Sequence, residues 1–125
     1  MHSAGVASGG APRRALDRAL FGVAIAISAF VLLWPSAPGV PLFPYSDKIV
    51  HALVFAALAW TGRRAGLPVM GLGVGLLVYA VGSEVVQHTL LPGRSGDLTD
   101  VVADLVGVAL GLVLARHLRP HDRAR

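Results

Sequence analysis

Residues 83–111 carry polar side chains that could transfer protons or bind an anionic group, although most of the surrounding residues are apolar. Their carboxylates and imidazole can exchange protons, and the arginine can hold a phosphate or carboxylate. Ionisable groups within an apolar segment are costly to bury, so each one requires an explanation. The residues concerned are Glu84, Gln87, His88, Arg94, Asp97, Asp100 and Asp104.

A second polar group precedes this segment at Asp47, Lys48 and His51. Asp47 and His51 are four residues apart and therefore share one face of a helix, as do Glu84 and His88. We expect these groups to meet at one depth, with His51 and Glu84 as the candidates for proton transfer. The predicted polar cluster comprises Asp47, Lys48, His51, Glu84, Gln87, Arg94, Asp100 and Asp104.

Each of these residues also has a structural interpretation. His51 alone is more often a hydrogen-bonded buried residue than a ligand. Gln87 alone is more simply a bridge between helices. Asp100 can cap a helix and pair with Arg94. Asp104, one turn deeper, needs a proton or a partner such as Lys48 or Arg94. Further structural interpretations are a helix cap and interfacial charge for Asp47 and Lys48, and a cap or loop position for Asp97; the role of His88 stays open.

The composition identifies the elements that must position these groups. The 125 residues form one domain, of which 54% are hydrophobic and only 14% charged. So much apolar surface in so short a chain indicates an integral membrane protein, and it excludes a soluble DNA-binding protein. The absence of cysteine excludes disulfides and thiolate chemistry.

Four apolar segments predict an all-α membrane four-helix bundle. We expect helices at residues 16–35, 46–62, 67–91 and 98–118, with Ser46 capping the second. Residues 1–14 are predicted to be a disordered tail, and residues 119–125 a basic one. A cleaved signal peptide is the alternative for the first helix, but the apolar run is long and no convincing cleavage site follows it.

The basic residues predict the orientation. With four spans, nine of the eleven lysines and arginines fall on one side, and only Lys48 and Arg94 on the other. The positive-inside rule then places both termini in the cytoplasm and the polar cluster toward the outside of the cell membrane. Two glycine pairs, Gly71 with Gly75 and Gly107 with Gly111, predict close helix packing and allow a homo-oligomer.

Four sequence patterns resemble those of the VanZ-like family of small bacterial membrane proteins. These are Asp47-Lys48-x-x-His51-x-x-x-Phe55-x-x-Leu58, Glu84-x-x-Gln87, Pro92-Gly93-Arg94, and Asp100-x-x-x-Asp104-x-x-Gly107-x-x-x-Gly111. The family usually has asparagine where this chain has Asp104. The resemblance implies a cell-envelope membrane protein, in some members linked to reduced susceptibility to teicoplanin, and it implies no specific reaction.

The leading hypothesis is that an outer-leaflet polar site acts on a lipid-linked or cell-wall component, with membrane lipids as partners. Two alternatives are a scaffold whose polar cluster only locks the helices, and a small transporter or proton relay. No cofactor, metal or nucleic acid is predicted. A divalent metal site from His51, Glu84 and Asp100 is conceivable, but spacing within single helices does not specify one.

Overall fold

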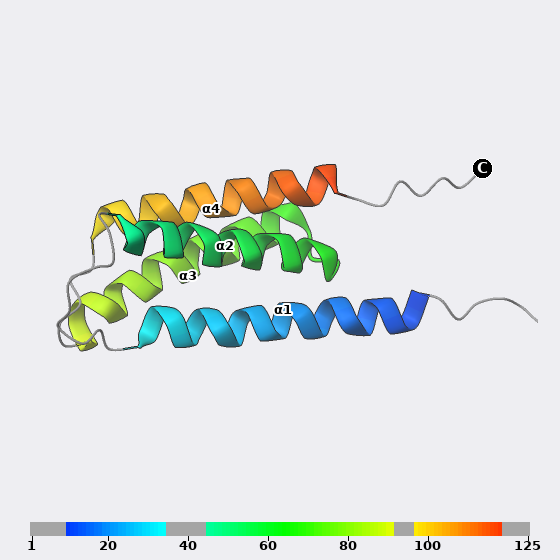
Figure 1. The fold of residues 1–125 in the computed structure, drawn as a ribbon, viewed down its shortest axis with the longest axis horizontal. Helices are drawn as coiled ribbons and strands as arrows, with labels where there is room; N and C mark the ends of the chain where they lie inside the picture. The colour runs from blue at the N-terminus through cyan, green and yellow to red at the C-terminus, as the bar shows by residue number, and fades with distance from the viewer. Residues whose placement is uncertain (1–9, 35–44, 92–96, 119–125) are drawn as a thin grey trace, which may run out of the picture.

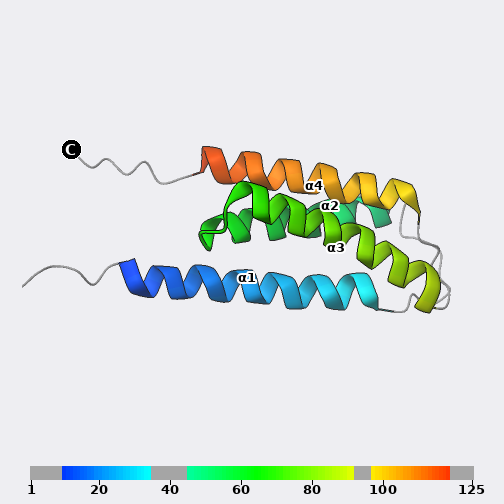
Figure 2. The same ribbon diagram turned by 180° about the vertical axis from the view of Figure 1, so that it is seen from behind.

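The structure is a computed structural model that describes residues 10–34, 45–91 and 97–118. These residues form four helices, α1 (Gly10–Leu33), α2 (Ser46–Arg64), α3 (Val69–Leu90) and α4 (Leu98–His117), with no strand among them. The all-α prediction is therefore confirmed. Figures 1 and 2 show that successive helices run in opposite directions, so α2 is parallel to α4 and α1 is parallel to α3.

α2 lies between α1 and α4 and has its most extensive contact with α4. Among the described helices, α1 contacts α2 and α3 but not α4. Two ends of the bundle can be defined. The polar end is where α1 and α3 finish, near Trp34 and Leu91, and where α2 and α4 begin, near Tyr45 and Asp97. The opposite end, which carries Arg13, Arg14, Arg63, Arg64 and Arg116, is called the basic end.

The helix boundaries follow local chemistry. α1 begins at Gly10, six residues before the expected start at residue 16, because Pro12 is tolerated in a first helical turn. Ser46 does not cap α2; Tyr45 is the N-cap, with a left-handed backbone (φ 65°) and no side-chain cap. The α2–α3 turn contains Gly66 at φ 92°, a conformation that glycine adopts without steric cost.

Asp97 is the N-cap of α4, which confirms the cap interpretation of this residue. The backbone N–H of Thr99 donates to Oδ1 of Asp97 at 3.1 Å. This hydrogen bond lowers the pKa of the Asp97 carboxyl and favours the charged form beside the helix N-terminus. The start of α4 is thereby fixed, which in turn sets the positions of Asp100 and Asp104 one and two turns along.

Polar groups lie inside the bundle while large apolar side chains cover its surface. Met70, Leu90 and Leu98 are each more than 70% exposed, whereas the buried polar residues are Ser28, His51, Thr61, Ser83, Glu84, Gln87, Asp100 and Asp104. This distribution suits a lipid environment, in which exposed apolar groups cost nothing and polar groups need internal partners. α1, α3 and α4 are long and apolar enough to cross a membrane.

Candidate functional site

A close contact between α2 and α4 determines the position of the site. A Cβ added to Gly107 would collide with the backbone carbonyl of Ala52, and one added to Gly111 would collide with that of Ala56. Neither carbonyl can move without shifting the whole helix. The two glycines therefore allow the helix axes to approach closely, and side chains one to two turns nearer the polar end meet directly.

His51 and Asp104 form the centre of the site. Nδ1 of His51 lies 2.7 Å from Oδ1 of Asp104, and the two residues are 1% and 0% exposed. An ionised carboxylate can only accept a hydrogen bond, so with Asp104 ionised the Nδ1–H of His51 donates to it. In the neutral imidazole this assignment leaves Nε2 with a lone pair. Nε2 has no hydrogen-bond partner among the described residues.

Glu84 brings α3 into the same site. Its Oε2 accepts the backbone N–H of Asp97 at 3.1 Å, which ties α3 to the start of α4. Its Oε1 lies 3.9 Å from Nδ1 of His51. Within the described part of the chain, Oε1 of Glu84 and Oδ2 of Asp104 are buried without a hydrogen-bond partner. Buried oxygens without partners are rare and costly, so each of these two atoms calls for a proton, a water molecule, an ion or a ligand beside it.

Asp47, Lys48 and Asp100 form the rim of the site at the polar end. Oδ1 of Asp47 lies 3.8 Å from Nε2 of His51. Nζ of Lys48 donates to Oδ1 of Asp100 at 3.1 Å and lies 4.0 Å from Oδ2 of Asp97. Asp100 is buried, whereas the Asp47 side chain is 60% exposed. We call the set of His51, Glu84, Asp104, Asp47, Asp100 and Lys48 the His51 site.

Two members of the predicted polar cluster lie elsewhere. Gln87 bridges α3 to α1, since its Nε2 donates to the backbone carbonyl of Leu32 at 2.6 Å. Arg94 lies outside the described residues, and so does its predicted pairing with Asp100. His88 is exposed on α3.

The partner of Asp104 is the feature that sequence reasoning missed. The sequence predicts a proton on Asp104 or a cation partner, Lys48 or Arg94, whereas the structure pairs Lys48 with Asp100 and places His51 against Asp104. The pairing of His51 with Asp104 could have been predicted from the parallel direction of α2 and α4, because the two residues lie at similar distances from the starts of their helices. His51 is five residues into α2, and Asp104 is six residues into α4.

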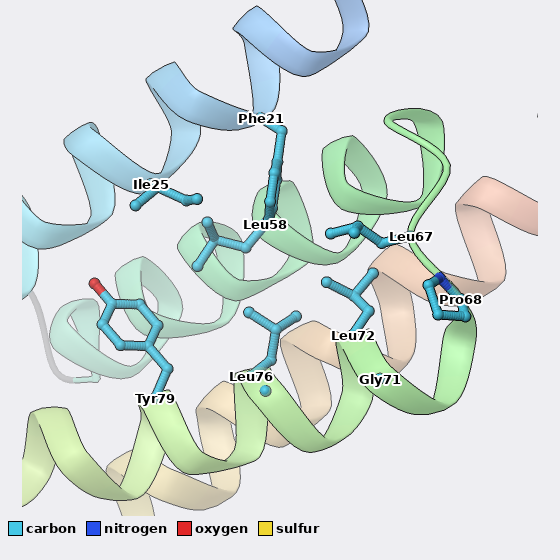
Figure 3. A pocket seen from close by; sticks show the side chains of 10 residues that line it. Phe21, Ile25, Leu58, Leu67, Pro68, Gly71, Leu72, Leu76 and Tyr79 are labelled. Carbon is cyan, nitrogen blue, oxygen red and sulfur yellow. The ribbon is translucent and has the colours of Figure 1, made fainter. Parts of the chain in front are cut away.

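An apolar cavity lies on the other side of the bundle, between α1, α2 and α3 (Figure 3). It measures about 360 Å³, and Figure 3 shows side chains of Phe21, Ile25, Leu58, Leu72 and Tyr79 around it. Gly71 and Gly75 also line it. A Cβ on Gly71 would contact only Pro68, and one on Gly75 would contact nothing within 4 Å. This glycine pair therefore borders a cavity and does not pack against another of the four described helices.

Comparison with known proteins places this arrangement in a family. The family model for VanZ/LLP1 matches residues 16–119, a range that contains every residue of the His51 site. The chain belongs to the VanZ/LLP1 family. It is also 36% identical over 103 residues to "Uncharacterized protein C11E3.10" of Schizosaccharomyces pombe, an alignment that covers 77% of this chain. The chain spans 60% of the length of that relative. No solved structure matches it.

Proposed function

We propose that this VanZ/LLP1 protein acts on the headgroup of a lipid-linked envelope component at the His51 site. One observation carries the proposal: His51 is buried and held by Asp104 through Nδ1, while its Nε2 has no hydrogen-bond partner among the described residues and lies on the side of Asp47. An imidazole that is oriented by a carboxylate on one nitrogen and free on the other is the arrangement that acid–base and metal sites require. A purely structural histidine would have both nitrogens satisfied.

The same site offers the remaining groups for such a reaction. Two atoms can accept a proton, Nε2 of His51 and Oε1 of Glu84, and both lie in a region screened from water. Lys48 supplies a cation at the rim for an anionic headgroup, and its ammonium acts as a point charge that suits phosphate. A relative also occurs in a fission yeast. We therefore favour a substrate group that bacteria and yeasts share, a phosphate ester on a lipid, over a group found only in peptidoglycan.

The location follows from the charge pattern. We propose that all four helices cross the cytoplasmic membrane of a bacterial cell with both termini inside. α2 carries four charged residues, as many as α1, and they lie at its two ends, Asp47 and Lys48 at one and Arg63 and Arg64 at the other. The basic end would then face the cytoplasm and the His51 site the outer leaflet. The apolar cavity beside α1 and α3 would accommodate part of the lipid's hydrocarbon chain.

A drug-susceptibility assay tests the proposal. We would express wild type, His51→Asn, Glu84→Gln and His88→Asn in a Gram-positive host and measure teicoplanin and vancomycin susceptibility together with membrane abundance. His88→Asn is the matched control, because His88 is an exposed histidine on α3. We expect wild type and the control to reduce teicoplanin susceptibility, and the two site variants to lose the effect at equal abundance.

One alternative, a scaffold, rests on the polar contacts between α2 and α4, because His51–Asp104 and Lys48–Asp100 join these helices. A scaffold predicts that His51→Asn and Glu84→Gln reduce membrane abundance and that any remaining protein protects as well as wild type. Wild type that is abundant but gives no protection would contradict the link to teicoplanin.

A further inference from the structure

We propose that the His51 site binds a divalent cation of the Mn²⁺ or Zn²⁺ type, with Nε2 of His51, Asp47 and Asp100 as its protein ligands. The proposal deepens the function proposed above, since it names an ion at the same site, but its geometric basis is independent of any substrate. Each of the three residues offers one ligand atom, and these atoms all lie within 4.8 Å of one another.

The distances fit a cation at the polar end. Two ligands about 2.1 Å from a tetrahedral metal are separated by about 3.4 Å, and Nε2 of His51 lies 3.8 Å from Oδ1 of Asp47. The three ligand atoms all lie within 4.8 Å of one another, so rotations of the Asp47 and Asp100 side chains would have to bring them to the separation of about 3.4 Å. One imidazole and two carboxylates favour Mn²⁺ or Zn²⁺ over Ca²⁺, which prefers oxygen ligands alone.

The unpartnered Nε2 is the observation that points to a ligand. His51 is 1% exposed, and its Nε2 has no hydrogen-bond partner among the described residues, although two carboxylates lie nearby. A histidine that binds a metal nearly always donates its other ring N–H to a carboxylate or carbonyl. Asp104 accepts the Nδ1–H of His51 at 2.7 Å and therefore acts as the positioning residue.

A second set of three groups exists deeper in the bundle, His51, Glu84 and Asp104, but it suits a cation less well. A metal there would have to bind Nδ1 of His51 and so break the 2.7 Å contact with Asp104. All three of these residues are buried, whereas the first set includes Asp47, whose side chain is 60% exposed. With the cation on Nε2, Glu84 is the proton acceptor that remains free.

Lys48 provides a sharp test because its ammonium already contacts Asp100. A cation on Asp100 must compete with this charge or displace it. Removing the charge while keeping an unbranched side chain, as in Lys48→Met, should tighten metal binding about thirtyfold, the effect of one positive charge about 4 Å from a divalent ion in water. A variant that gains affinity cannot be explained by misfolding.

The experiment is titration of Mn²⁺ into the purified full-length chain, without a histidine tag, in nanodiscs. Binding is followed by electron paramagnetic resonance, and Zn²⁺ affinity by competition. Asp47→Asn, His51→Asn and Asp100→Asn should each weaken Mn²⁺ binding by more than about 100-fold, and Asp104→Asn by about 10-fold or less. Glu84→Gln and the control His88→Asn should bind as wild type does, and Lys48→Met more tightly.

Three results would overturn the inference: no Mn²⁺ or Zn²⁺ binding by wild type, equal binding by His51→Asn, or loss of binding in Glu84→Gln with retention in Asp47→Asn. The last result would assign the ion to the deeper set. Failure here is distinct from failure of the proposed function. If the protein binds no metal but protects against teicoplanin in a way that depends on Glu84, only the proposed cation is contradicted. If it binds metal but gives no protection, only the proposed link to teicoplanin is contradicted.

Discussion

The α2–α4 interface and the α1–α3 side of the bundle each contain two glycines four residues apart, but the surroundings of the two pairs differ. Gly107 and Gly111 lie against the backbone of α2, whereas Gly71 and Gly75 border a cavity of about 360 Å³. The polar contacts differ as well. Ionisable side chains join α2 to α4, while α1 and α3 are joined by Gln87 with the Leu32 carbonyl and by a 2.9 Å hydrogen bond between Ser28 and Tyr79.

The difference shows that two glycines four residues apart permit close packing without requiring it. α4 packs closely because the residues above the glycines, Asp100 and Asp104, have partners on α2 that hold the helices together. On the face of Gly71 and Gly75, the contact to a neighbouring helix is the neutral hydrogen bond between Tyr79 and Ser28. We therefore expect the α2–α4 interface to carry the stability of the fold and the α1–α3 side to tolerate change.

The largest expected effect comes from filling the α2–α4 interface. Gly111→Leu should destabilise the bundle by about 3 kcal/mol or more, because the new side chain meets the backbone of Ala56 and the side chain of Ala59. Membrane abundance and the fraction that remains monodisperse after heating in detergent measure the effect. A variant as heat-stable as wild type would contradict the close approach of α2 and α4.

Breaking the His51–Asp104 contact should have the next largest effect. Asp104→Leu leaves Nδ1–H of His51 buried without an acceptor and should cost about 2 kcal/mol. Asp104→Asn retains a side-chain oxygen that can accept the same hydrogen bond, so its cost should be clearly smaller. The measurement is thermal stability of the two variants in the same detergent. Equal losses would show that charge, rather than a hydrogen-bond acceptor, is what His51 needs.

On the other side of the bundle, Gln87→Leu removes the hydrogen bond from α3 to the carbonyl of Leu32. The expected loss is about 1 kcal/mol, the usual net contribution of one hydrogen bond. Hydrogen exchange at the end of α1 reports it most directly, because the bond fixes this end to α3. Unchanged exchange at residues 28–33 would show that apolar packing alone positions α1.

The smallest effect is expected where the cavity is filled. Gly75→Leu is the counterpart of Gly111→Leu and should change stability by less than about 0.5 kcal/mol, since a Cβ at Gly75 meets nothing within 4 Å. Heating both variants together compares the two glycine pairs in a single experiment. A loss at Gly75 as large as that at Gly111 would mean that the cavity face is occupied, for example by a second copy of the chain.

The sequence places the polar groups near one end of their helices, but it does not give their pairing. Helical spacing shows that His51, Glu84, Asp100 and Asp104 lie within about two turns of one end, which is why their convergence could be anticipated. Spacing within a helix does not fix the rotation of one helix against another. The pairing therefore depends on how α2 packs against α4, which places His51 beside Asp104 and Lys48 beside Asp100.

The helix starts show a similar limit. Asp97 was recognisable as a cap because its short side chain can accept a backbone N–H two residues on, as it does from Thr99. Ser46 has the same ability, yet the chain enters α2 through a left-handed Tyr45, and Ser46 becomes the first helical residue. The residue that caps a helix depends on the direction from which the preceding segment arrives, which composition does not reveal.

Both proposals depend on one property of His51: Asp104 holds it through Nδ1, and its Nε2 presents a free lone pair. Solid-state NMR of the chain labelled with ¹⁵N-histidine in lipid bilayers at neutral pH measures this directly, with His51→Asn to assign the signals. We predict a protonated Nδ1 that couples to the Asp104 carboxyl and a non-protonated Nε2. A ring protonated on both nitrogens, or on Nε2 alone, would contradict the account, since no lone pair would then face Asp47 and Asp100.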